Sequence, residues 1–116
     1  MASKKTAGHI ALVEARTKLP EEAVERAVSL FGHGTLLVKM YAPRGHDPQT
    51  PHTRDEVYVV ASGSGEFFDG EKRVSFSPGD FLFAPAGVVH RFERFSDDFF
   101  VWVMYYGPEG GESAGP

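Results

Sequence analysis

Three residues of this chain have types and a spacing that indicate chemistry: His52, Glu56 and His90. His52 and Glu56 stand four positions apart in the stretch QTPHTRDEVYVVASG, and His90 begins a later predicted strand, just after the turn at residues 85–87. Side chains at even separations along a strand share one face, so a continuous strand over residues 51–61 would project His52 and Glu56 to the same side. Burying both without partners is costly. The pattern therefore predicts a bound cation or a dense set of hydrogen bonds.

The elements that must position these residues are predicted to be short strands. The chain has 116 residues, enough for one domain with a single core, and its 13 glycines and 8 prolines favour tight turns. Strands are predicted at residues 9–15, 35–41, 56–61, 65–68, 72–76, 80–84, 90–95 and 99–106. Asp69-Gly70 is typical of a two-residue hairpin turn. This spacing predicts an all-β sandwich or small barrel.

One helix is predicted over residues 20–31. There Val24, Val28 and Phe31 recur at helical spacing, glutamates occupy the first turn, and Gly32 follows the last turn. We expect this helix to lie on the sheet. Residues 1–8 and 107–116 are polar and rich in small residues, so they are predicted to be flexible tails of a single domain at residues 9–106.

Composition excludes several classes of partner. The formal net charge is −4 and the basic run is confined to Lys4-Lys5, so neither nucleic acid nor an anionic membrane is an expected partner. No apolar run approaches the roughly 20 residues that span a bilayer, and no signal peptide is evident. The chain has no cysteine, which suits a cytoplasmic location and leaves only nitrogen and oxygen ligands for a metal.

Two spaced motifs make the chain resemble the cupins. The matching residues are Gly45, His52, Glu56 and Gly63 in the first motif and Gly79, Pro85, Gly87 and His90 in the second. Residues 64–78 separate the motifs, a short distance that is usual in small microbial cupins. The resemblance covers about residues 35–106. It implies a double-stranded β-helix, or jelly-roll, barrel, with the short predicted helix at its N-terminal side.

The resemblance also implies a metal centre with one divalent ion, bound by His52, Glu56 and His90. The chain departs from the family pattern at Thr50, where the family has its first histidine, and at Arg94, where the family has an asparagine that is not a ligand. Gln49 is the preferred replacement for the missing histidine because it is nearer. Some cupins use glutamine in a Gln-x-His ligand pair, and the gap from Gln49 to His52 is one residue longer. His46 is the other candidate.

The function that the resemblance implies is metal-dependent chemistry on a small organic molecule. Two neutral imidazoles and a carboxylate suit Fe, Mn, Ni or Zn and leave coordination positions open. The reaction would be of the oxygenase, isomerase or decarboxylase type. A non-catalytic cupin that binds or senses a small ligand is the alternative, and a metal-free polar pocket is the third hypothesis.

Two further expectations concern surfaces. Arg54 would either pair with a substrate carboxylate or face solvent beside Asp55. Residues 99–106 are all apolar or aromatic, and they cannot all face one barrel interior. We therefore expect their outward half to be covered by the helix or by a second subunit, and the resemblance favours a homodimer.

Overall fold

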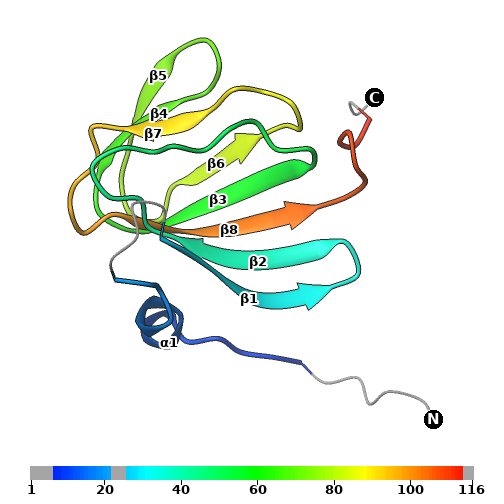
Figure 1. The fold of residues 1–116 in the computed structure, drawn as a ribbon, viewed down its shortest axis with the longest axis horizontal. Coiled ribbons are helices and arrows are strands. Elements are labelled where there is room, and N and C mark those ends of the chain that lie inside the picture. The colour runs from blue at the N-terminus through cyan, green and yellow to red at the C-terminus, as the bar shows by residue number, and fades with distance from the viewer. Residues whose placement is uncertain (1–6, 22–25, 114–116) are drawn as a thin grey trace.

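Two antiparallel sheets form the molecule, and a short helix lies beside one end of the larger sheet (Figure 1). The computed structural model describes residues 7–21 and 26–113. The five-stranded sheet has the order β1-β2-β8-β3-β6 and the three-stranded sheet the order β5-β4-β7. The elements are α1 (Leu12–Thr17), β1 (Ala27–His33), β2 (Leu36–Tyr41), β3 (Asp55–Ser62), β4 (Gly65–Phe68), β5 (Arg73–Phe76), β6 (Phe81–Ala84), β7 (Arg91–Glu93) and β8 (Phe100–Tyr106).

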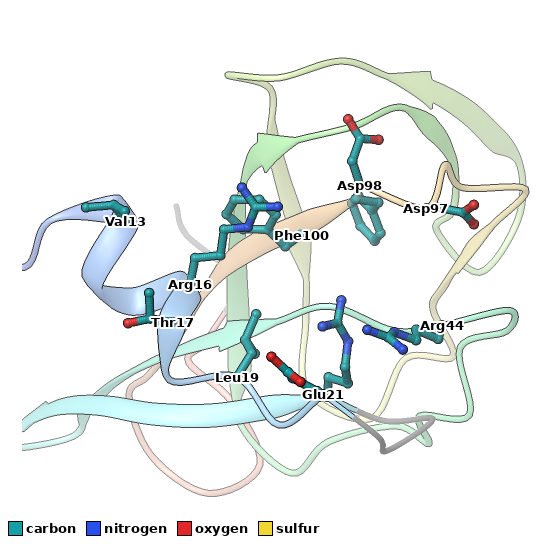
Figure 2. A pocket seen from close by; sticks show the side chains of 11 residues that line it. Val13, Arg16, Thr17, Leu19, Glu21, Arg44, Asp97, Asp98 and Phe100 are labelled. Carbon is teal, nitrogen blue, oxygen red and sulfur yellow. The ribbon is translucent and has the colours of Figure 1, made fainter.

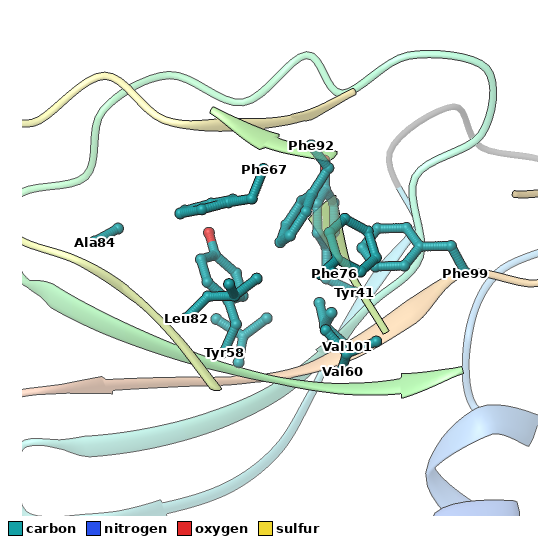
Figure 3. Close-up of a cluster of buried hydrophobic side chains, with 11 residues drawn as sticks. Tyr41, Tyr58, Val60, Phe67, Phe76, Leu82, Ala84, Phe92, Phe99 and Val101 are labelled. Atoms are coloured by element: carbon teal, nitrogen blue, oxygen red, sulfur yellow. The ribbon is translucent and has the colours of Figure 1, made fainter. Parts of the chain in front are cut away.

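The main core lies between the two sheets and is largely aromatic (Figure 3). Phe92 of β7 is at its centre, with its ring centroid 4.9 Å from that of Tyr58 and 4.8 Å from that of Phe99. The other buried members are Tyr41, Val60, Phe67, Phe76, Leu82, Ala84, Val101 and Val103. Along β3 the buried residues alternate with partly exposed ones, as a strand with one face on a core requires. The all-β fold is therefore confirmed.

The strands predicted from residue 35 onward are confirmed within two residues at each end. One turn differs slightly from its prediction. The Asp69 N–H donates to the Lys72 carbonyl at 3.0 Å, which leaves Gly70 and Glu71 at the tip of the β4–β5 hairpin. Gly70 has a φ of 106°, a conformation that glycine adopts readily.

The predictions for the N-terminal part were wrong: the helix and the strand are exchanged. Residues 12–15 of the predicted strand 9–15 lie in α1, and residues 27–31 of the predicted helix 20–31 belong to β1. Residues 22–25 of that prediction lie outside the described residues. β1 pairs with β2 from Ala27–Tyr41 to His33–Leu36, so pairing with the next strand overrode a weak local helical pattern.

α1 packs on the outer face of the five-stranded sheet. Ala15 and Leu19, four residues apart, are buried against Met40, Ala42 and Phe100. A helix does lie on the sheet, but residues 12–17 form it and not the predicted residues 20–31. No helix in the described part of the chain, residues 7–21 and 26–113, is both long enough and apolar enough to cross a membrane.

The segment after β8 makes hydrogen bonds to the barrel. The Gly110 N–H donates to the Thr53 carbonyl at 2.7 Å, and the Glu112 N–H donates to the Asp55 carboxylate at 2.8 Å. The flexibility expected for residues 107–116 stays a prediction, but residues 110 and 112 have defined partners.

Candidate metal centre

The two motifs meet at one end of the barrel. Glu56 lies on the inward face of β3, His52 lies three residues before that strand, and His90 immediately precedes β7. The Gly87 N–H donates to the His52 carbonyl at 2.8 Å, which fixes the two histidine segments side by side. One ligand atom from each of His52, Glu56 and His90 lies within 4.8 Å of the others. The structure thus brings together the three residues singled out in the sequence.

Glu56 is fully buried and has one oxygen without a hydrogen bond. Its Oε1 lies 2.9 Å from His90 Nε2 and accepts a hydrogen bond from the Tyr58 hydroxyl. Its Oε2 lies 3.4 Å from His52 Nε2, but no donor among the described residues forms a hydrogen bond to it. Burial alone would raise the pKa of Glu56, but hydrogen bonds from His90 and Tyr58 and the nearby imidazoles hold it below its ordinary value. The carboxylate is therefore ionised and partly unsatisfied.

The tautomer of His90 follows from its other contact. His90 Nδ1 lies 2.9 Å from the Val88 carbonyl oxygen, and a carbonyl can only accept, so Nδ1 has the proton. In the neutral ring the lone pair of Nε2 then points at Glu56. Burial lowers the pKa of His90, but the hydrogen bonds to Glu56 and Val88 outweigh burial and raise it. A proton or a cation is needed between this nitrogen and the carboxylate.

Tyr58 belongs to the site although the sequence analysis did not include it among the candidate residues. It is 1% exposed, and its hydroxyl lies 3.0 Å from His90 Nε2 and 3.2 Å from Gln49 Oε1. Burial, together with the Glu56 charge, raises the pKa of Tyr58 well above its ordinary value, so the hydroxyl stays protonated. The even spacing from Glu56 on β3 was the signal that pointed its side chain inward.

Of the two candidates for the missing histidine, the structure places Gln49 beside the three residues. Gln49 Oε1 lies 3.3 Å from His52 Nε2. His46 is exposed, and so is Thr50. Tyr105, on β8, also approaches, with its hydroxyl 3.3 Å from His52 Nε2.

Comparison with known proteins decides the family. The family model of the cupin domain matches residues 37–106, more than half of the chain. The chain belongs to the cupin family. Its jelly-roll fold and the resemblance drawn from the two motifs are therefore confirmed.

The relatives of this cupin differ in what their names describe. An uncharacterised protein of Streptomyces coelicolor is 40% identical over 63 residues, which are 54% of this chain and 60% of that protein. The DMSP lyase DddQ from Ruegeria pomeroyi is similar in structure, with a TM-score of 0.64 and 23% identity over 72% of this chain and 47% of the lyase. A putative mannose-6-phosphate isomerase from Ralstonia eutropha has a TM-score of 0.65 and 21% identity. The likeness covers 88% of this chain and 100% of the Ralstonia chain. These structural likenesses show the fold alone.

The residues of this cupin fit a divalent metal. The donor set has two imidazoles, a carboxylate with an unsatisfied oxygen, and an amide oxygen at its edge. A hollow of about 50 Å³ lies beside them, lined by Gln49, His52, Tyr58 and Tyr105 among others. That volume accommodates an ion and a few waters. Nitrogen and oxygen donors of this kind suit several first-row metals.

The centre opens to solvent past His52, whose side chain is 33% exposed. His52 also lines two surface hollows, of about 250 Å³ and about 390 Å³. Arg54 borders the smaller one: its guanidinium donates to the Thr35 carbonyl and lies 5.9 Å from the centroid of the Tyr105 ring. These contacts hold Arg54 at the rim of the opening. Its pairing with a substrate carboxylate stays a prediction.

A larger hollow lies elsewhere, between α1 and the barrel (Figure 2). It measures about 720 Å³, and Arg16, Arg26 and Arg44 line it together with the acidic residues Glu21, Asp97 and Asp98. Burial, with the charges of the other two arginines, lowers the pKa of Arg26. None of the three residues of the metal centre lines this hollow. Chemistry and not size therefore identifies the candidate site.

Proposed function

We propose that this cupin binds one divalent metal ion through His52, Glu56 and His90, with Gln49 Oε1 as a fourth protein ligand. The observation that supports this most strongly is the buried Glu56 Oε2, which accepts no hydrogen bond from any of the described residues and faces His52 Nε2 at 3.4 Å. An ionised buried oxygen without a partner is costly. A cation coordinated there would satisfy it together with the Nε2 lone pairs.

The proposed activity is metal-dependent conversion of a small organic molecule. Fe, Mn, Ni or Zn at such a site would polarise a substrate oxygen or, for redox metals, activate dioxygen. An oxygenase, isomerase or decarboxylase type of reaction is compatible with this, and a lyase and a putative isomerase share the fold. Substrate would enter past the part-exposed His52, with Arg54 at the rim to pair with a carboxylate or phosphate.

We also propose that two copies of the chain form a homodimer through the outer face of the five-stranded sheet. Phe81 and Phe83 of the edge strand β6 are 65% and 44% exposed on this face. Large exposed aromatic side chains that are neighbours on a sheet favour association.

Metal content tests the proposal directly. We expect the purified protein, reconstituted separately with Fe, Mn, Ni and Zn, to hold close to one ion per chain by elemental analysis. His52→Ala and His90→Ala should fall below about 0.1 ion per chain because each removes a ligand. His46→Ala is the matched control, since His46 is exposed and lies outside the ligand set.

Circular dichroism on each variant separates loss of the ligand from loss of the fold. Wild-type protein that takes up no metal would contradict the proposal. Turnover is tested by incubating the metal-loaded protein with DMSP and with mannose 6-phosphate, the compounds in the names of two structural relatives. Bound metal without turnover of these or related compounds would favour the non-catalytic alternative.

A further inference from the structure

Asp47 is a buried carboxylate that the proposed ligand set does not use. It is 9% exposed and lies in the loop between β2 and β3. Four donors surround it: the Tyr41 hydroxyl, the Gln49 N–H at 3.3 Å, the Gln49 side-chain Nε2 at 2.6 Å and the Phe92 N–H at 2.8 Å. Both carboxylate oxygens are therefore satisfied, and one of the contacts reaches the candidate ligand Gln49.

This contact determines which end of the Gln49 amide faces the metal centre. Each oxygen of Asp47 already accepts a hydrogen bond from a backbone N–H, and the group of Gln49 that approaches Oδ2 is its NH₂, which donates to it. The amide oxygen then points the other way. In the structure Oε1 lies 3.3 Å from His52 Nε2 and 3.2 Å from the Tyr58 hydroxyl.

The position of Asp47 is itself fixed from two strands. The Tyr41 hydroxyl comes from the end of β2, and the Phe92 N–H comes from β7, 45 residues after Asp47. Asp47 therefore connects the loop that contains Gln49 to both sheets of the barrel. A carboxylate held in this way orients its partner at little further cost in conformational entropy.

We propose that Asp47 is a positioning residue that holds Gln49 with its amide oxygen toward His52, Glu56 and His90, as a ligand in place of the histidine absent at Thr50. This inference rests on the proposed metal-binding function. Without Asp47 the amide rotates freely and presents its NH₂ part of the time, and an NH₂ group cannot bind a cation. Loss of an outer-shell partner typically lowers metal affinity by about 10- to 100-fold.

A double-mutant cycle tests whether Asp47 acts through Gln49. Mn²⁺ affinity is measured by the EPR signal of the free ion in wild-type protein, Asp47→Ala, Gln49→Ala and the double variant. We expect about a 10- to 100-fold loss in Asp47→Ala and no further loss when Asp47→Ala is added to Gln49→Ala. An equal loss in both backgrounds would mean a merely structural role and would overturn the proposal.

Two controls separate orientation from folding. Asp97→Ala removes an exposed carboxylate that takes no part in the Asp47 and Gln49 hydrogen bonds, and it should leave Mn²⁺ affinity unchanged. Asp47→Asn keeps an acceptor oxygen for the Gln49 NH₂ and should restore most of the affinity that Asp47→Ala loses. If Asp47→Asn binds as weakly as Asp47→Ala while remaining folded, the acceptor argument is wrong.

A metal-free measurement distinguishes this inference from the proposed function. In the nitrogen-15 NMR spectrum of the metal-free protein, the Gln49 NH₂ should exchange slowly with solvent, and this protection should vanish in Asp47→Ala. Wild-type protein that binds no Mn²⁺ would overturn the proposed function and, with it, the ligand role of Gln49. Mn²⁺ binding that is unchanged in Asp47→Ala would overturn the positioning role alone.

Discussion

At the scale of single residues, Asp55 and Glu56 have different partners although they are neighbours in the chain. Glu56 faces the barrel interior, whereas the Asp55 carboxylate accepts the Ala86 N–H at 2.9 Å and the Glu112 N–H at 2.8 Å. These two amides hold the pKa of Asp55 below its ordinary value. Ala86 lies in the turn that leads to His90, so Asp55 connects the turn of the second motif to β3.

Replacement of this carboxylate should destabilise the fold. Asp55→Asn places an NH₂ against one of the two backbone N–H groups, which leaves a largely buried donor unsatisfied. We expect the free energy of unfolding at neutral pH, from urea titration, to fall by about 2 kcal/mol. The exposed Asp97 provides the control, because Asp97→Asn should change stability by less than about 0.5 kcal/mol. Equal stability of the two variants would contradict a structural role for Asp55.

At the scale of elements, the β3–β4 turn depends on Gly63, the last residue of the first motif. Gly63 has a φ of 86°, and a Cβ there would lie 2.6 Å from the Cα of Phe99. Gly79, the first residue of the second motif, has a similar φ of 92° but open space around it. Alanine substitutions at the two positions therefore distinguish the cost of an unusual backbone conformation, which both share, from the cost of a steric overlap, which only Gly63→Ala has.

We expect Gly63→Ala to be the more damaging substitution. Strain and overlap together should lower the free energy of unfolding by about 3 to 5 kcal/mol, whereas strain alone in Gly79→Ala should cost about 1 to 2 kcal/mol. Thermal and urea unfolding of both variants measure the difference. Equal costs would show that the chain at Phe99 moves aside without penalty.

The elements also show what the sequence could and could not predict. Two strands were evident from the local sequence because clear turn residues bound them. Apolar and polar or aromatic side chains alternate over residues 56–59, and residues 99–106 are wholly apolar or aromatic. Residues 27–33 become a strand because they pair with β2, and that information is not in the local pattern. Likewise, the two motifs predicted that His52, Glu56 and His90 would meet. The approach of Asp47 to Gln49 depends on how a loop folds against β7, which no spacing rule describes.

At the scale of the whole molecule, the outer face of the five-stranded sheet is apolar across its full width. Residues paired in an antiparallel sheet share a face, and one row of pairs crosses all five strands. Its members are Phe83, Val57, Met104, Val38 and Phe31. Each of the five side chains stays partly or largely exposed. α1 covers the end of the sheet near Met40 and Phe100, so it does not account for this row.

A second copy of the chain that covers this row would make the protein dimeric, and sedimentation velocity at micromolar concentration should show a dimer. Phe83→Lys places a charge in the row and should shift the protein to monomer, because burying an unpaired ammonium between apolar faces is unfavourable. Ser75→Lys on β5, an exposed position of the other sheet, is the matched control and should remain dimeric.

The thermal midpoint of Phe83→Lys at low protein concentration should stay close to that of the wild type, since Phe83 is already 44% exposed within one chain. A wild-type protein that sediments as a monomer would rule out the proposed dimer, and a Phe83→Lys dimer would place the interface elsewhere on the molecule.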